Sequence, residues 1–406
     1  MKWGYIRAED FCESVRDGTH DTPKPAEIGY KLITGKHIKN GQIDSSDAYY
    51  ISVKDYQKIN ERSLVEQWDV LMSMIGTVGE VALVKKHPDY AIKNIALFKC
   101  GNSKLKGKWL TYYLKSSEAK GHISGNQKGS SQQFLSLKQL RSLPVLITDE
   151  GYMQRVVNIL SCYDDLIENN QKQIKLLEEA VQRLYKEWFV DLRFPGYETT
   201  PIIDGIPQGW KNQKLSDIFD YVRGRSYNSN ELSETSGILM VNLKNIRPFG
   251  GYNRNAEKRY LGQYKENQTL LAGDIVMGVT DMTQERRLIG HVAIIPEFCE
   301  NATFSMDIIK LMPKHISRNF LYATLFFGEY SKKISPLANG TNVLHLKPES
   351  MMNMEMLIPR EDIIYKFDLF FEPIRKNIDI LENQCKKAKE ARDRLLPKLM
   401  SGEWEE

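Results

Sequence analysis

Two stretches of this sequence carry the same pattern of apolar residues, the second 211 residues after the first. In the first stretch the pattern advances by alternating steps of four and three residues, which is the a/d spacing of a coiled-coil seam. The seam positions are Val156, Leu160, Tyr163, Ile167, Asn170, Ile174, Leu177, Val181, Leu184 and Trp188. Only Asn170 is polar, and the 33 residues of the seam would form a helix about 50 Å long. Such a helix cannot bury its apolar stripe alone, so the pattern predicts a helical partner.

The second stretch supplies the candidate partner. Its positions are Phe367, Phe371, Ile374, Ile378, Leu381, Cys385, Ala388, Arg392, Leu395 and Leu399. Only Arg392 is charged, so this helix also has a continuous stripe that tolerates burial. The simplest interpretation is two long helices of one chain that pack on each other. The alternative is a pair of unrelated surface helices on separate domains, and a wider repeat in the chain weighs against it.

The wider repeat covers the segments that precede the two helices. Trp3 matches Trp210, and WDVLMS from Trp68 matches GDIVMG from Gly273, with offsets that stay between 205 and 211 residues. Short apolar runs punctuated by Gly, Asn and Asp indicate strands in the first copy. These runs are Val70–Ile75, Glu80–Val84, Ile92–Phe98 and Leu143–Ile147, with a short helix expected at Trp109–Ser117. The sequence therefore predicts a tandem duplication in the order mixed domain, helix, mixed domain, helix.

Cysteine usage and hydropathy indicate the compartment. The five cysteines are dispersed and form no CxxC pair, which favours a reducing compartment without a disulfide framework. The N-terminus MKWGYIRAED has no apolar core of a signal peptide, and no stretch approaches 18 continuous apolar residues. We therefore expect a cytoplasmic protein that neither is exported nor spans a membrane.

Motifs that would indicate catalysis are missing from the sequence. It contains no GxxxxGK[ST] nucleotide loop, no [DN]PP[YFW] tetrapeptide and no HExxH metal site. The glycine-rich run at Gly76–Glu80 lacks the strand and helix context of a dinucleotide site and is better explained as a tight turn. His291 lies in an apolar run and is more often a core histidine than a ligand. We therefore predict no catalytic residue and no metal ligand in this chain.

Basic segments at matched positions of the two copies favour a nucleic-acid partner. The net charge of +4 permits such a partner without showing one, so the location of the cations matters. Lysine and arginine supply phosphate contacts, and arginine, asparagine and glutamine can also read base edges. The candidates are Lys36, Lys39 and Asn40 in the first copy, and Arg223, Arg225, Lys244, Arg247, Arg254, Lys258, Arg259, Arg286 and Arg287 in the second. Each one alone could equally belong to an ordinary solvated loop.

A polar loop before the last strand of each copy is a second candidate surface. It contains Ser130 and Gln132 in the first copy and Thr341 and Asn342 in the second. Small hydroxyl and amide residues after a glycine allow the backbone to approach a ligand closely. They also form ordinary turns, and the sequence alone does not decide between the two.

Three stretches give the chain a family resemblance. They are QRLYKEWFVDLRFPGYE (Gln182–Glu198), IPQGW (Ile206–Trp210) and RLLPKLMSGE (Arg394–Glu403). Together with the duplicated architecture, they resemble the specificity subunits of type I restriction-modification systems. The resemblance implies an α+β fold with two pseudo-symmetric mixed α/β target-recognition domains, separated by a long antiparallel two-helix coiled coil. We place these parts at residues 1–150 (first domain), 151–198 (first spacer helix and linker), 199–360 (second domain) and 361–406 (second spacer helix).

The resemblance also implies a function and a set of partners. Each domain would read one half of a bipartite site in the major groove of double-stranded DNA, and the helices would set the spacing. The helices would also dock two methylation subunits, to which restriction subunits are added, and S-adenosylmethionine, ATP and magnesium would belong to these partners. Apolar residues near the helix ends are the expected docking residues: Trp188, Phe189, Leu395 and Leu399.

Two other functions are compatible with parts of the sequence. A stand-alone DNA-binding regulatory or structural protein would explain the basic segments but not the apolar helix ends. A fused restriction-methylation enzyme would need a methyltransferase motif upstream of the first domain, and the given sequence starts with that domain. Co-purification of the chain with a methylation subunit would distinguish the specificity subunit from the stand-alone regulator.

Overall fold

The computed structural model describes residues 3–125, 134–256, 258–297 and 301–403. The chain divides into two compact units, one formed by Met1–Ile167 with Lys387–Glu406 and the other by Glu168–Lys386. The two long helices, α6 (Glu150–Tyr185) and α10 (Glu361–Ser401), each contribute to both units. Each unit therefore combines one mixed domain with a part of each helix, and the domain limits expected from the sequence stay a prediction.

The first unit contains a four-stranded antiparallel sheet with the order β2-β10-β7-β8. Its strands are β2 (Ser14–Asp17), β10 (Ile95–Lys99), β7 (Val70–Ser73) and β8 (Val81–Leu83). The central strands β7 and β10 are buried along their whole length, as expected for short apolar runs. Three further strands form a smaller sheet in which β3 (Tyr30–Ile33) pairs antiparallel with β6 (Tyr50–Ile51) and parallel with β9 (Tyr90–Ile92).

One predicted strand is two strands in the structure. The run Ile92–Phe98 was expected to be continuous, but β9 ends at Ile92 and β10 begins at Ile95 in a different sheet. Asn94 lies between them with a φ of 52°, in the left-handed region that asparagine tolerates better than most residues. The prediction of a single strand was therefore wrong because a local turn interrupts the apolar run.

The second unit repeats the topology of the first. Its four-stranded sheet has the order β15-β23-β19-β21, and each of these strands occupies the place of β2, β10, β7 or β8. A parallel pair within a mixed sheet also recurs, formed here by β17 and β22, with β18 on the other side of β17. The strands are β15 (Phe219–Arg223), β23 (Ile308–Pro313), β19 (Ile275–Gly278), β21 (Val292–Ile294), β16 (Leu232–Ser233), β18 (Lys258–Tyr260), β17 (Ile238–Val241) and β22 (Ala302–Phe304). The predicted duplication is thereby confirmed at the level of strand order.

Terminal strand pairs and short helices complete each mixed domain. The pair β1 (Gly4–Arg7) and β11 (Pro144–Ile147) in the first unit corresponds to β14 (Lys211–Lys214) and β25 (Glu355–Ile358) in the second. The short helices are α1 (Ala8–Phe11), α2 (Val53–Ser63), α3 (Lys104–Lys115), α4 (Ser117–Gly125), α5 (Leu137–Arg141), α7 (Leu215–Ile218), α8 (Arg318–Phe327) and α9 (Tyr330–Ile334). The helix α3 follows β10 as α8 follows β23, so the helices repeat as well.

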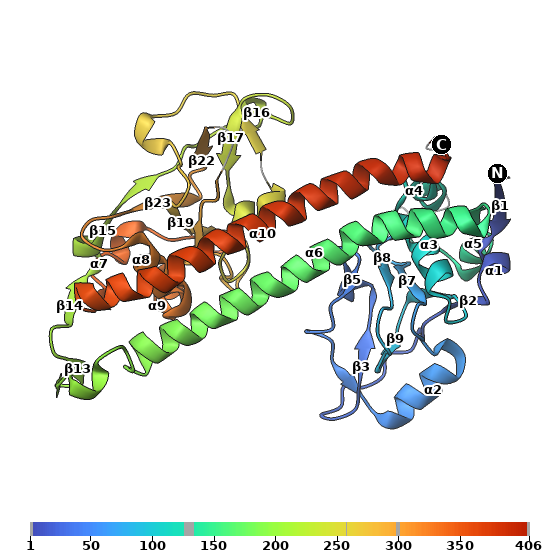
Figure 1. Cartoon of the computed structure of the whole chain (residues 1–406), viewed down its shortest axis with the longest axis horizontal. Helices are drawn as coiled ribbons and strands as arrows, with labels where there is room; N and C mark the ends of the chain where they lie inside the picture. The colour runs from blue at the N-terminus through green and yellow to red at the C-terminus, as the bar shows by residue number, and fades with distance from the viewer. Residues whose placement is uncertain (1–2, 126–133, 257, 298–300, 404–406) are drawn as a thin grey trace. The chain divides into compact units, whose positions relative to one another are not determined.

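The two long helices pack antiparallel in each unit, as Figure 1 shows with α6 in green and α10 in red. In the first unit, the Tyr152 hydroxyl of α6 donates to the Leu399 carbonyl of α10 at 3.0 Å. In the second unit, the Asn170 amide donates to Gln384 at 2.9 Å, and the ring of Trp188 lies 6.2 Å from that of Phe367. The polar seam residue Asn170 is therefore buried with a hydrogen-bond partner on the other helix.

Residues of both long helices belong to the hydrophobic core of each mixed domain. In the first unit, Leu160 of α6 and Leu399 of α10 belong to the main core of the domain. In the second unit, Val181 and Trp188 share a core with Phe320 of α8 and Phe367 of α10.

Among the described residues, no helix has both the length and the apolar surface needed to cross a membrane.

Candidate nucleic-acid interface

The basic residues of the first domain lie on and beside a tight hairpin. Strands β4 (Ile38–Lys39) and β5 (Gln42–Ile43) are joined by Asn40 and Gly41, whose φ values are 53° and 78°. Two successive positive φ values are typical of a type I′ turn, which suits an Asn-Gly pair. Lys39 and Asn40 are exposed at this turn, whereas the Lys36 ammonium forms a 3.0 Å ion pair with Asp47.

The second domain holds its basic residues in a tightly hydrogen-bonded segment, residues 244–260, called here the second basic segment. The Asn245 amide donates to the Asn253 carbonyl, and the Asn253 amide donates back to the Lys244 carbonyl, both at 3.0 Å. The Asn242 amide, just before the segment, donates to the Ala256 carbonyl at 3.2 Å. These bonds pair backbone carbonyl groups that have no partner in a β-sheet, so the segment is a well-ordered loop.

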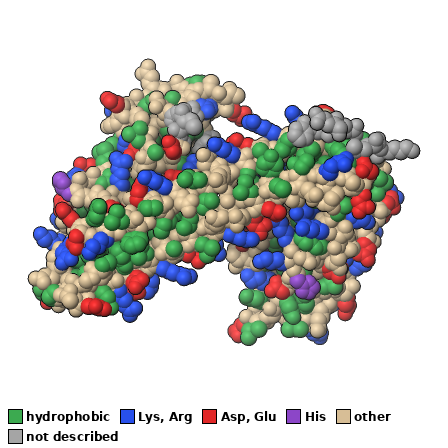
Figure 2. Space-filling view, in the orientation of Figure 1, with side chains coloured by type: hydrophobic (Ala, Val, Ile, Leu, Met, Phe, Trp, Pro, Cys, Tyr) green, Lys and Arg blue, Asp and Glu red, His purple; other side chains and the backbone are tan. Residues whose placement is uncertain are grey.

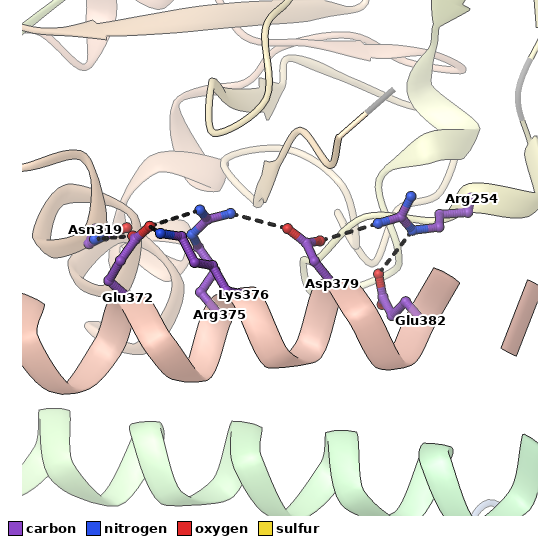
Figure 3. Close-up of polar contacts among 7 residues, drawn as sticks. All are labelled: Arg254, Asn319, Glu372, Arg375, Lys376, Asp379 and Glu382. Carbon is purple, nitrogen blue, oxygen red and sulfur yellow. Dashed lines mark hydrogen bonds and ion pairs between the residues drawn. The ribbon is translucent and has the colours of Figure 1, made fainter. Parts of the chain in front are cut away.

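Two arginines of this segment contact α10: Arg254, which Figure 3 shows, and Arg247. Arg254 lies 3.2 Å from Asp379 and 3.3 Å from Glu382, and Arg247 lies 2.6 Å from Glu382. The Arg254 side chain is only 12% exposed. Both arginines were expected to contact DNA, and the structure instead places their guanidinium groups on carboxylates of the helix.

The same row of α10 side chains continues toward α8 (Figure 3). Arg375 bridges Glu372 at 3.3 Å and Asp379 at 3.2 Å, and the Asn319 amide of α8 donates to Glu372 at 2.8 Å. Burial raises the pKa of Asp379, although Arg254 and Arg375 act against that shift. Two parts of the second domain are thus fastened to one face of α10.

The first domain is also hydrogen-bonded to its long helices. The bonds lie at positions that the repeat relates to those of the second domain, but they are made by different residue types. The Lys108 ammonium of α3 donates to the Ser161 hydroxyl of α6 at 2.7 Å. Each of these residues lies 211 positions before Asn319 and Glu372, which form the corresponding bond in the second unit. The Asp164 carboxylate of α6 accepts a hydrogen bond from Tyr112 at 2.7 Å and forms an ion pair with Arg392 at 2.6 Å. The charged seam residue Arg392 is therefore compensated inside the first unit.

Several other predicted DNA contacts also have partners in their own domain. Arg223 forms an ion pair with Glu349 at 2.9 Å, and hydrogen bonds from Tyr221 and Arg223 lower the pKa of Glu349 to about 2. Arg259 donates to the Gly237 carbonyl at 2.8 Å. Arg287 forms an ion pair with Glu285, and Arg286 donates to the Ser335 carbonyl at 2.9 Å.

The structure brings two of the predicted surfaces of the second domain together. The second copy has extra residues around positions 281–287 that the first copy lacks, and this stretch, called here the inserted loop, carries Arg286 and Arg287. It follows β20 (Thr280–Asp281), which pairs with β24 (Leu344–His345) beyond the polar loop. The Gln284 amide of the inserted loop donates to the Thr341 carbonyl at 2.9 Å. The buried Asp281 carboxylate accepts from the backbone amides of Thr283 and Leu288 at 2.7 Å and closes the inserted loop. Thr341 and Asn342 are exposed beside it, so these residues form one surface.

The remaining candidates fall into three groups. Arg225 and Lys244 are exposed, Lys258 is partly buried, and Ser130 and Gln132 lie outside the described residues. Sequence reasoning missed Phe249, which is 64% exposed and has a φ of 68°. Its amide donates to the Arg287 carbonyl at 2.9 Å, so it links the second basic segment to the inserted loop. A positive φ is rare for an aromatic residue and marks a strained position, which the sequence alone does not reveal.

The expected docking residues face the chain's own cores. Trp188 and Leu399 are 7% and 2% exposed, and Phe189 and Leu395 are partly buried against the same cores. Exposed apolar side chains do occur on α10, at Tyr365, Leu369 and Phe370. Tyr365 and Leu369 are four positions apart and lie on one side of the helix, whereas Phe370 lies about 100° further round. The ring of Phe370 lies 6.0 Å from that of Trp188. These three exposed residues are called here the exposed patch of α10.

Surface charge is mixed on the face that Figure 2 shows, where Lys and Arg side chains are interspersed with Asp and Glu. Within the described part of the chain, no group of three or more His, Cys, Asp or Glu side chains is placed to hold a metal ion. The cations that could contact a polyanion are therefore the exposed ones of the hairpin, the second basic segment and the inserted loop.

Comparison with known proteins matches both copies separately. A family model described as the type I restriction modification DNA specificity domain matches residues 1–179 and again residues 207–387. The type I restriction enzyme MjaIX specificity subunit of Methanocaldococcus jannaschii is 27% identical, over 99% of this chain and 93% of its own length. The corresponding HindI subunit of Haemophilus influenzae is 24% identical over 69% of this chain and 73% of its own length. The crystal structure of an S subunit from M. genitalium has the same fold, with a TM-score of 0.60 at 15% identity, over 98% of this chain and 96% of that one.

Proposed function

The chain belongs to the family of type I restriction-modification DNA specificity subunits, and we propose that each of its mixed domains reads one half of a bipartite site in double-stranded DNA. The observation that carries this proposal is the repeated topology. Two domains with the same strand order in one chain suit a target with two separate halves. Their different loop sequences suit two different half-sites.

We propose the residues that contact DNA from the position and the exposure of their side chains. Lys39 and Asn40 would serve the first domain, because the hairpin turn presents them to solvent. In the second domain, exposed cations and polar residues on the second basic segment, the inserted loop and the polar loop would serve the same purpose. Those residues are Lys244, Arg287, Thr341 and Asn342, with Phe249 as an exposed aromatic contact. The exposed Arg225, just after β15, and the partly buried Lys258, on β18, would add two further cations. Major-groove reading by such side chains depends on hydrogen bonds to base edges, and the phosphate contacts fix the register.

We further propose that the helix pair sets the half-site spacing and docks two methylation subunits. The exposed patch at Tyr365, Leu369 and Phe370 is a better docking candidate than the buried Trp188 or Leu399. The chain would then carry no catalysis of its own. S-adenosylmethionine, ATP and magnesium would be bound by the methylation and restriction subunits.

Methylome sequencing of cells that express this chain with its methylation subunit tests the proposal. Two readers on one face of the duplex should give a motif with two defined halves and a degenerate spacer, with half-site centres roughly 10 bp apart. A contiguous motif would refute the bipartite model. A stand-alone regulator is the second candidate, and it predicts specific DNA binding with neither co-purification of a methylation subunit nor any methylated motif.

A further inference from the structure

We propose that Arg254, supported by Arg247, is a positioning residue that fixes the second basic segment against α10 and so sets the orientation in which the segment meets DNA. This inference rests on the proposed function, because it concerns how the second domain presents its contacts. It assigns to both arginines a role different from the DNA contact that the sequence favoured.

The first observation is the enclosure of the Arg254 side chain. The Arg254 side chain is 12% exposed, and that of its partner Glu382 is 13% exposed. A guanidinium that binds a DNA phosphate must be reachable from solvent, whereas a buried one must be paired to offset the loss of its hydration. Arg254 meets the second condition through Asp379 and Glu382, and Arg247 adds a further bond to Glu382.

The second observation is the rigidity of the segment to which Arg254 belongs. The hydrogen bonds of Asn242, Asn245 and Asn253 tie the segment to itself, and Asn245 is fully buried. Fixing Arg254 therefore fixes Lys244 and Phe249 as well, because they belong to the same hydrogen-bonded block. Lys258, later in the segment, lies on β18, which pairs with β17.

The third observation is a second point of attachment on the same helix. The Ser317 hydroxyl donates to Asp368 at 2.8 Å, and the Asn319 amide donates to Glu372 at 2.8 Å. From Asp368 to Glu382 the helix advances by 14 residues, or about 21 Å. One attachment would leave the domain free to pivot, whereas two attachments this far apart define its direction along α10.

The experiment compares the two sides of the ion pairs in the full-length chain assembled with its methylation subunits. The probe is a duplex that carries the motif found by methylome sequencing of the wild-type complex. Variants are Arg254→Ala, Arg254→Lys and the double neutralisation Asp379→Asn with Glu382→Gln. The matched control is Glu390→Gln, which removes one charge from an exposed site of α10 roughly two turns beyond Glu382.

We expect the double neutralisation and Arg254→Ala each to weaken binding to the motif about tenfold, with the dependence of affinity on salt unchanged. Arg254→Lys should recover part of the loss, because a lysine keeps the charge but not the two-point bond. Glu390→Gln should bind as the wild type does. Circular dichroism should show that the variants are folded. Titration with the duplex should show that the whole of each preparation is able to bind DNA, so that the loss lies in the affinity itself.

Other results would overturn the inference. If Arg254 contacted DNA, Arg254→Ala would lower the salt slope by about one, and removal of the opposing carboxylates would leave the affinity unchanged or raise it. A reduced active fraction with wild-type affinity would show a purely structural role, and an equal loss in Glu390→Gln would show an effect of net charge. Wild-type affinity in every variant would refute the positioning role and leave the proposed function unaffected. If the wild-type complex itself neither bound nor methylated a defined motif, the proposed function would fail, and this inference with it.

Discussion

Glu372 on α10 lies among three nitrogen donors. The Asn319 amide donates to it at 2.8 Å, and Arg375 and Lys376 lie 3.3 and 3.2 Å from its carboxylate. Burial would raise the pKa of Glu372, but these donors outweigh burial and lower the pKa from 4.5 to about 2. A carboxylate with a lowered folded-state pKa stabilises the fold above its unfolded value, near pH 4.5. That contribution is lost as the pH falls toward 2.

We therefore expect Glu372→Gln to lower the free energy of unfolding at pH 7 by about 1 kcal/mol. The lowered pKa would be worth about 3 kcal/mol for a fully enclosed group, and we discount it because the side chain is 34% exposed and screened by solvent. The difference from the wild type should shrink below pH 4.5 and disappear near pH 2. Urea unfolding of the full chain at several pH values measures it, with Glu390→Gln as the control, and a difference that does not change with pH would contradict the assignment.

The basic residues show which parts of the candidate site a sequence can predict. Lys39 and Asn40 were chosen from the basic composition of their segment, and the Asn-Gly turn that exposes them is a local signal in the sequence. Their contact with DNA stays a prediction. The role of Arg247 was not found, because its partner Glu382 lies 135 residues further along the chain. Arg223 is paired in the same way with Glu349, 126 residues away. Composition counts the charges of such residues, but only the fold shows which of them are already neutralised.

At the scale of the element, the helices were predictable because their periodicity is regular over many turns. The same periodicity marks the seam positions as suited to burial, but it does not tell which apolar side chains of a helix face the chain's own core and which are left for a partner. Trp188 falls in the first class and Leu369, outside the seam, in the second. The run Ile92–Phe98 shows the opposite difficulty, because its seven residues have no helical or alternating period. They contain the last residue of β9, a turn and most of β10.

The exposed patch of α10 gives a prediction for subunit docking. Tyr365→Glu combined with Leu369→Lys should weaken binding of the methylation subunit at least tenfold, because charges would enter an apolar contact that excludes water. Pull-down and sedimentation of the complex measure this loss. The control is Ile380→Lys, another exposed apolar residue of the same helix, which should keep the complex intact. Equal weakening by both changes would show that the patch at Tyr365 and Leu369 has no special role.

At the scale of the whole molecule, the internal repeat allows one copy of the helix to be compared with the other. Asn170 donates to Gln384, which lies 211 residues after Gln173. In a homodimer of the first half of the chain, each Asn170 would therefore face Gln173 of the second copy, and both hydrogen bonds would be kept. The polar seam position is thus compatible with such a dimer.

The core of the first unit is less compatible with a homodimer. Leu396, Leu399 and Met400 fill it in the full chain, and the residues 211 positions earlier are the larger Tyr185, Trp188 and Phe189. Inserting larger side chains into a packed core costs about 1–3 kcal/mol. We therefore expect residues 1–198 to dimerise weakly, and the variant with Tyr185→Leu, Trp188→Leu and Phe189→Met to dimerise more tightly. Sedimentation over a range of concentrations measures both constants, and a variant no tighter than the parent would refute the size argument.

The division of the chain also determines the order in which the two units can be completed during translation. The first unit needs Lys387–Glu406, yet the 219 residues of Glu168–Lys386 are translated between its two parts. At roughly 5–20 residues per second, the first domain waits about 10–40 s for the helix segment that completes its core. During that interval the apolar stripe of the nascent α6 has no partner from its own chain. A ribosome-bound chain of this kind is therefore a natural client for chaperones, and the second unit, Glu168–Lys386, can close before the first.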